Sequence, residues 1–240
     1  MTPKLIGVIL AGGRGSRLDG MDKGLLEIDG RKLIEYCVAT IRPQVNTIII
    51  SANRNLAVYR QFADIVLPDT PQQRSYSDRV HPDNHQPDHY QSDLSKSDDY
   101  PAPEYSGPLS GIISVMRYLE QNQHHGSADL LTVPCDMPLL PSDLVKRLYA
   151  TRMLHDSGEE RVVVAHDGHR VQPLCALLSL SAKSRLESFL ATGQRKVLDW
   201  VEHIDALIAD FSDDPEKFIN INTQENARRF SDKIKNHVEY

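Results

Sequence analysis

The chain has 240 residues, of which 40% are hydrophobic and 25% charged, so it has the composition of an ordinary globular protein and room for one large α/β domain or two small ones. Its formal net charge of -6 argues against a general affinity for nucleic acid, which needs a positive field. No apolar run approaches the roughly 20 residues that cross a bilayer, and the three cysteines form no CxxC pair. We therefore expect a cytoplasmic protein without membrane contact, disulfide framework or zinc knuckle.

Short apolar segments alternate with helical patterns along most of the chain. An almost continuous apolar run at 5–10 predicts a strand covered on both faces, and helical spacing at 33–41 predicts a helix. The other expected elements are strands at 47–50, 65–67, 130–133, 162–165 and 174–178, helices at 56–62, 111–119, 182–190 and 197–201, and a final helix capped by Thr223. This alternation predicts parallel βαβ units in an α/β fold, with ligands at the carboxyl ends of the strands.

One stretch departs from this pattern. Residues 71–105 are rich in Asp, Ser, Gln, Pro and His, and they carry few aliphatic side chains. Such a segment cannot contribute much to a core. We expect residues 1–240 to form one domain with a polar, flexible insertion at about 71–105.

A glycine-rich segment follows the first predicted strand. Residues 10–23 read LAGGRGSRLDGMDK, and the glycines let backbone N–H groups approach a ligand that a Cβ would keep away. Three cations, Arg14, Arg17 and Lys23, suit a triphosphate whose leaving group gains charge as a phosphoanhydride bond breaks. The spacing matches neither the dinucleotide fingerprint GxGxxG nor the Walker ending GK[ST]. The segment predicts a phosphate-binding loop, and a glycine-rich surface turn with solvated charges is the alternative.

An aspartate leaves the end of a later predicted strand. Asp136 lies between Pro134 and Pro138, which restrict the backbone there. Because Mg²⁺ is typically held by one or two carboxylates together with substrate phosphates, Asp136 is predicted to be a metal ligand opposite the glycine loop. A turn or helix-capping aspartate is the alternative. Cys135 is interpreted as a core thiol, since nothing nearby in the sequence would lower its pKa.

Polar side chains recur where other predicted strands end. Ser51 and Asn53 follow one strand and Asp69 follows the next, at an edge where a base or ribose could be read. Each of these alone is weak evidence, because such residues commonly form turns. Asn220 and Asn222 place two amides on one face of an extended segment.

These segments occur together, and in this order, in one known family. The chain resembles the molybdenum cofactor guanylyltransferases of bacteria. The resemblance rests on LAGG at 10–13 followed by Arg17 and DKGL at 22–25, on GPLSG at 107–111, on PCDMP at 134–138, on QPL at 172–174 and on NINT at 220–223. These motifs span nearly the whole chain and leave only 71–105 unmatched, so the set is highly specific.

The resemblance implies a fold and a reaction. The fold is a single Rossmann-like nucleotidyltransferase domain, with a mostly parallel sheet and helices on both faces. The reaction transfers GMP from GTP to the terminal phosphate of Mo-molybdopterin, forming Mo-molybdopterin guanine dinucleotide and pyrophosphate, with Mg²⁺ as cofactor. The implied partners are these two substrates and, transiently, proteins of molybdenum insertion and molybdoenzyme maturation; we expect a monomer.

The resemblance also implies roles for individual residues. Lys23, Arg17 and Asp136 would be catalytic, with Arg17 assisting charge neutralisation and Asp136 binding Mg²⁺. Ser51 stands where the family often has Asn, so a contact made by that side chain would be shorter or replaced. The implied GTP-binding residues are Leu10, Ala11, Gly12, Gly13, Lys23, Ser51, Asn53, Asp69 and Asp136, and the implied pterin-binding residues are Arg195, Asn220 and Asn222.

Two alternatives stay open. The first is a cytidylyltransferase for the same pterin, or another NTP-dependent nucleotidyltransferase, which would share almost every catalytic residue and differ in base choice. The second is a non-catalytic nucleotide-binding module. Retention of both Lys23 and Asp136 disfavours that module, because binding without turnover needs neither a leaving-group cation nor a metal carboxylate.

Overall fold

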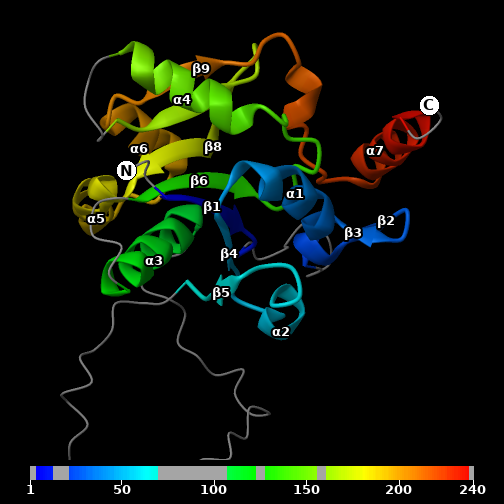
Figure 1. Ribbon diagram of the computed structural model, residues 1–240, viewed down its shortest axis with the longest axis horizontal. Coiled ribbons are helices and arrows are strands. Elements are labelled where there is room, and N and C mark those ends of the chain that lie inside the picture. The colour runs from blue at the N-terminus through cyan, green and yellow to red at the C-terminus, as the bar shows by residue number, and fades with distance from the viewer. Residues whose placement is uncertain (1–3, 13–21, 70–106, 123–127, 156–160, 238–240) are drawn as a thin grey trace, which may run out of the picture.

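The computed structural model describes residues 4–12, 22–69, 107–122, 128–155 and 161–237, and its centre is one seven-stranded sheet (Figure 1). The strand order is β5-β4-β1-β6-β8-β7-β9, and β8 is the one strand that runs antiparallel to its neighbours. The strands are β1 (Lys4–Leu10), β4 (Thr47–Ser51), β5 (Ile65–Leu67), β6 (Ala128–Pro134), β7 (Val163–His166), β8 (Val171–Ser179) and β9 (Leu207–Asp210). A separate two-stranded hairpin joins β2 (Glu27–Ile28) and β3 (Arg31–Lys32).

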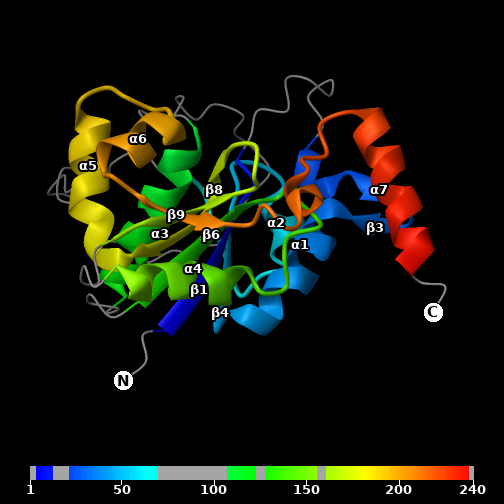
Figure 2. The same cartoon turned by 90° about the horizontal axis from the view of Figure 1, so that it is seen from above.

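Helices cover both faces of the sheet because successive strand residues point to opposite sides. Val8 packs with α3 (Pro108–Gln121), α5 (Lys183–Ala191) and α6 (Val197–His203), whereas Ile9 packs with α1 (Leu33–Ile41) and α4 (Leu144–Leu154). Figure 2 shows these two helical layers on either side of the strands. The central strands are buried on both faces, which explains why they read as continuous apolar runs.

The last helix of the described chain packs beside α1. Helix α7 (Gln224–His237) packs its Phe230 edge-on against Tyr36 of α1 at a centroid distance of 5.0 Å. Thr223 caps it as predicted, accepting a hydrogen bond from the Asn226 N–H at 3.1 Å. The other short elements are α2 (Leu56–Tyr59), η1 (Lys23–Leu25), η2 (Arg42–Gln44), η4 (Leu180–Ala182) and η5 (Pro215–Phe218).

The chain order creates a switch point between β1 and β6. From β1 the chain moves outward through β4 to β5, and then returns through α3 to place β6 on the other side of β1. Ligands of open α/β sheets bind outside the carboxyl ends of the strands at such a point. We therefore expect a ligand site among the residues that follow β1, β4, β5 and β6.

The predicted α/β class with a mostly parallel sheet is confirmed. Strand β9 was not predicted, and neither was the antiparallel direction of β8. The expected insertion at about 71–105 lies outside the described residues. Every helix in the described ranges is too short or too polar to cross a bilayer.

Candidate active site at the carboxyl edge of the sheet

Three side chains from distant parts of the chain meet beside the end of β6. Lys23 Nζ lies 3.3 Å from Asp136 Oδ2 and also donates a hydrogen bond to Asn222 Oδ1. The Lys23 and Asp136 side chains keep 27% and 15% of their surface exposed, so both can be reached by a ligand. We call Lys23, Asp136 and Asn222 the Lys23 cluster.

Backbone hydrogen bonds fix where Asp136 and Asn222 lie. The Cys135 N–H donates to the Leu10 carbonyl at 3.1 Å, which continues the β1–β6 pairing one residue past the strand. The Ile221 N–H donates to the Asp136 carbonyl at 2.8 Å, and the Ile221 side chain is buried against α1 and α7. The backbone of Ile221 thereby holds the next residue, Asn222, beside Asp136.

A second group of polar side chains lies at the ends of β4 and β5. Ser51 Oγ donates to Asp69 Oδ1 at 2.5 Å, and Asn53 Nδ2 donates to Asp69 Oδ2 at 2.9 Å. The Asp69 N–H donates in turn to Asn53 Oδ1 at 2.9 Å. We call Ser51, Asn53 and Asp69 the Asp69 cluster, and it brings together three residues that were predicted from the sequence.

Two glycines allow the backbone to approach this carboxylate closely. A Cβ on Gly111, in the first turn of α3, would lie 2.5 Å from Ser51 Oγ and 3.0 Å from Asp69 Oδ1. A Cβ on Gly12, after β1, would lie 2.9 Å from Asp69 Oδ2. The separations of 2.5 and 2.9 Å are shorter than a Cβ contact permits, so the Asp69 carboxylate lies between two segments that approach it closely as glycine.

The Asp69 carboxylate is buried, and no described cation forms an ion pair with it. Burial raises its pKa above the ordinary aspartate value, against the opposing effect of the hydrogen bonds from Ser51 and Asn53. Between described residues, no ion pair involves this carboxylate. An ionised carboxylate only accepts hydrogen bonds, so this group is suited to a ligand that presents N–H donors.

The cysteines near the site are not nucleophiles. Burial raises the pKa of the Cys37, Cys135 and Cys175 thiols, which keeps them protonated. Cys37 Sγ contacts the Cys135 carbonyl at 3.3 Å in the core. This environment agrees with the prediction that Cys135 is a core thiol.

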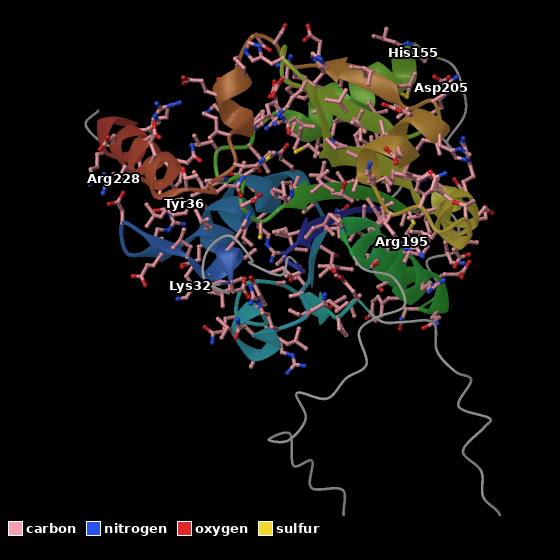
Figure 3. All side chains as sticks on the ribbon, turned by 180° about the vertical axis from the view of Figure 1, so that it is seen from behind. Lys32, Tyr36, His155, Arg195, Asp205 and Arg228 are labelled. Atoms are coloured by element: carbon pink, nitrogen blue, oxygen red, sulfur yellow. The ribbon has the colours of Figure 1, made fainter. Side chains whose placement is uncertain are left out.

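Arg195, predicted to contact the same ligand as Asn220 and Asn222, lies elsewhere. Figure 3 shows it between α5 and α3, and its guanidinium donates to the Leu190 and Gln194 carbonyls at 2.7 and 2.6 Å. No contact between described residues joins it to the Lys23 cluster. Asn220 is half-buried beside Ile221. Gly13 and Arg17 lie outside the described residues.

Several residues beside the site were not predicted. Asp22, adjacent to Lys23, is buried and accepts a hydrogen bond from the Tyr59 hydroxyl at 2.5 Å. Gly111 was identified as part of the GPLSG motif, but its close approach to Ser51 and Asp69 was not predicted. A tyrosine inside a short apolar segment carries no signal of such a contact, because its partner lies 37 residues away.

The charges of the site suit a polyanion with a bound cation. The described residues contain no group of three or more His, Cys, Asp or Glu side chains that could hold a metal ion alone. A hard cation at Asp136 would therefore need oxygen ligands from the substrate, which is the usual arrangement for Mg²⁺ on phosphates. The single carboxylate, next to an amide oxygen and a lysine, fits that arrangement.

Known proteins resemble this chain in sequence and in fold. Residues 7–207 match the model of the MobA-like NTP transferase domain. The molybdenum cofactor guanylyltransferase of Shewanella piezotolerans is 36% identical over 237 residues, covering 98% of this chain and 96% of that protein. The crystal structure of molybdopterin-guanine dinucleotide biosynthesis protein A from Archaeoglobus fulgidus superposes with a TM-score of 0.64 at 19% identity, covering 97% of this chain and all of that one. A 4-diphosphocytidyl-2C-methyl-D-erythritol synthase has the same fold, with a TM-score of 0.61 at 12% identity over 98% of this chain and 99% of that chain.

Proposed function

The chain belongs to the MobA-like NTP transferase family, and from that membership and the geometry of its site we propose that it transfers GMP from GTP to the terminal phosphate of Mo-molybdopterin. The observation that carries this proposal is the convergence of Lys23, Asp136 and Asn222 at the switch point between β1 and β6. A cation and a carboxylate held together at that point suit a triphosphate better than an uncharged ligand.

The transfer is a single displacement at phosphorus. An oxygen of the pterin phosphate attacks the α-phosphorus of GTP, a new P–O bond forms, and the bond between the α-phosphorus and the bridging oxygen breaks. The electron pair of that bond leaves with pyrophosphate. Lys23 stabilises the growing negative charge, with Arg17 and the backbone of Gly12 and Gly13 assisting, and positioning and electrostatics provide the rate without a covalent enzyme intermediate.

Asp136 is the residue that would hold Mg²⁺ together with the nucleotide phosphates. The metal, when bound, supplies positive charge that offsets the triphosphate. In the structure Lys23 contacts Asp136 and Asn222. Phosphate oxygens would take over as partners of the Lys23 ammonium group when GTP binds.

Asp69 is the residue that would select guanine over the other bases. The Watson–Crick edge of guanine carries two adjacent donors, the N1–H and the 2-amino group, whereas cytosine and adenine present acceptors at the corresponding ring nitrogens. An acceptor-only carboxylate therefore favours guanine. Gly12 lies beside the same carboxylate, and Ser51 and Asn53 donate hydrogen bonds to its two oxygens. Leu10 and Ala11 are proposed to contact the same nucleotide.

The pterin substrate would bind on the other side of Asp136. Asn222 is already part of the Lys23 cluster, and Asn220 lies two residues earlier on the same extended segment. Arg195, beside the first turn of α3, is proposed to contact the more distant part of the same substrate. The free thiols suit a reducing cytoplasm, where we propose that the enzyme works. The monomeric state stays a prediction.

Pyrophosphate release tests the reaction directly. We expect release with GTP in the presence of molybdopterin and Mg²⁺, and little with CTP or ATP under the same conditions. Release with CTP alone would identify the cytidylyl alternative, and nucleotide binding with no release under any condition would identify the non-catalytic module.

Variants of the Lys23 cluster test its role. Lys23→Ala and Asp136→Ala should each lower kcat by about 10²- to 10³-fold, comparable to the loss of one transition-state stabilising group. Melting temperatures should stay close to that of the parent protein. Lys146→Ala and Asp143→Ala, which change exposed side chains near α4, are the matched controls and should keep full activity. Full activity in either cluster variant would remove that residue from the mechanism.

A further inference from the structure

A buried carboxylate lies directly beside the catalytic lysine. Asp22 keeps 7% of its surface exposed, and its Oδ1 accepts a hydrogen bond from the Tyr59 hydroxyl at 2.5 Å. Its Oδ2 accepts a second hydrogen bond from Asn55 Nδ2 at 3.0 Å, and Arg54 Nε lies 3.7 Å away. All three partners come from one short segment, residues 54–59, which contains α2 and the two residues before it.

The direction of these hydrogen bonds is fixed by their surroundings. Tyr59 is fully buried in the core, and burial raises the pKa of its phenol, so the hydroxyl stays protonated and donates to Asp22. Asn55 has a φ of 53° and accepts the Tyr59 N–H at its carbonyl, at 3.1 Å. The two donors to Asp22 are thus held in place by the same turn.

Gly24 completes this arrangement on the other side of Lys23. A Cβ on Gly24 would lie 2.4 Å from Tyr59 Oη, so a residue with a side chain at this position would clash with the tyrosine hydroxyl. The Leu25 N–H then donates to the Asp22 carbonyl at 3.0 Å, and the Leu26 N–H donates to the Lys23 carbonyl at 3.1 Å. The backbone of Lys23 is therefore fixed both before and after its Cα.

We propose that Asp22, held by Tyr59 and Asn55, is a positioning residue that fixes the backbone from which Lys23 reaches Asp136 and the nucleotide phosphates. This inference rests on the proposed function of Lys23. Burying a carboxylate costs free energy that an apolar side chain at the same place would not, so stability alone does not explain Asp22. A lysine side chain has about 2 kcal/mol of rotamer entropy, and a fixed backbone limits the range of positions that its ammonium group can occupy.

A double-mutant cycle tests whether Asp22 acts through Lys23. Tyr59→Phe removes the hydroxyl donor and keeps the ring, and we expect kcat for GMP transfer to fall about 10-fold, since small misplacements of reacting groups cost up to about 10²-fold. In the Lys23→Ala background the same substitution should change kcat less than about twofold. Equal effects in both backgrounds would overturn the inference. The cycle is also measured as GTP affinity by calorimetry, which stays readable if Lys23→Ala turns over too slowly.

A matched tyrosine separates positioning from stability. Tyr36 is also buried and donates its hydroxyl to the Ile28 carbonyl at 3.0 Å, outside both clusters. Tyr36→Phe should lower the melting temperature about as much as Tyr59→Phe and leave kcat unchanged. An equal loss of kcat in both variants would mean a general effect of stability and would contradict the inference.

A second variant removes the other donor. Asn55→Gly suits the φ of 53° and deletes the amide, so it should fold and should reproduce part of the Tyr59→Phe effect on kcat. Unchanged kcat in both Asn55→Gly and Tyr59→Phe would overturn the inference while leaving guanylyl transfer intact. Full activity of Lys23→Ala, in contrast, would show that the proposed role of Lys23 itself is wrong, and the inference would fall with it.

Discussion

Asp69 and Lys23 bring opposite charges to one edge of the sheet, and each is held differently. Asp69 is fixed by hydrogen bonds to both oxygens, from Ser51 and Asn53, and it is buried. Lys23 is half-exposed and contacts its partners through a long, flexible side chain. In the proposed mechanism, a rigid group would select the base, and a flexible group that can move with the substrate would stabilise the developing charge.

If Asp69 recognises guanine as proposed, its raised pKa should make guanine binding depend on pH. Because burial raises this pKa, the charged acceptor form is present above the raised value and is lost as pH falls through it. Guanosine carries no titrating phosphate, so its affinity for wild type should report on Asp69. We expect full affinity at about pH 8 and a loss of affinity in acid that begins at a higher pH than the ordinary aspartate pKa of about 3.9.

Asp69→Asn is the control for this dependence. It should bind guanosine about 10²-fold more weakly, because an amide cannot accept from both guanine donors, and its affinity should not vary with pH in the same range. Competition calorimetry at several pH values measures both proteins. A wild-type affinity that stays constant down to the ordinary range of aspartate would contradict this role of Asp69.

At the scale of elements, α3 packs unusually close to the Asp69 cluster. Gly111→Ala would normally stabilise a helix by about 1 kcal/mol. Here the new Cβ would lie 2.5 Å from Ser51 Oγ, so we expect the opposite sign, a loss of about 1–3 kcal/mol with about 10-fold weaker GTP binding. Thermal melting and calorimetry measure the two effects.

Ser184→Ala, on the exposed side of α5, is the helix control for that substitution. It should leave GTP affinity unchanged and should not lower the melting temperature. A Gly111→Ala variant as stable as wild type would mean that α3 shifts away from β4 at little cost, and the close packing would then carry no specificity.

The elements that could be predicted from the sequence are those whose pattern depends on burial alone. The helix at 33–41 and the strand at 65–67 were predicted with their observed bounds, because apolar spacing ends there at clear breaks. Strand β9 alternates buried and exposed residues over four positions, which is too short for a periodic signal. The direction of β8 depends on its pairing with β6, which no local pattern records.

The site was predictable where a polar residue follows a buried strand. Asp69 and Asp136 were found by that rule, since the carboxyl ends of parallel strands share one edge. The contact between Asp22 and Tyr59 was not, because neither residue departs from what a loop or an apolar segment ordinarily contains. Arg195 was placed by resemblance alone, and it lies beside α3 rather than in the Lys23 cluster.

At the scale of the whole molecule, the strand order would place the two proposed substrates on different sides of β6. Asp69 follows β5 at one side of the sheet, Asp136 follows β6 near its centre, and β8 and β7 continue beyond it. The nucleotide base would lie toward β4 and β5, which leaves the side beyond β6 for the acceptor. The reacting phosphates would meet between them, at the Lys23 cluster.

This separation predicts different effects on the two Michaelis constants. Asn220→Ala should raise KM for molybdopterin about 10-fold and leave KM for GTP within about twofold, because Asn220 is proposed to contact only the acceptor. Asn226→Ala, in the first turn of α7, is the matched control and should change neither constant. Equal increases of both constants in Asn220→Ala would place this residue at the nucleotide instead.

The central claim is that the Lys23 cluster supports transfer of GMP, and the fate of labelled phosphate tests it most directly. Wild type is incubated with molybdopterin, Mg²⁺ and GTP labelled at either the α- or the γ-phosphate. We predict that the α-label enters the pterin product, that the γ-label leaves in pyrophosphate, and that Lys23→Ala slows both by about 10²- to 10³-fold. Appearance of the γ-label in the pterin product, or transfer by Lys23→Ala at the wild-type rate, would contradict the account.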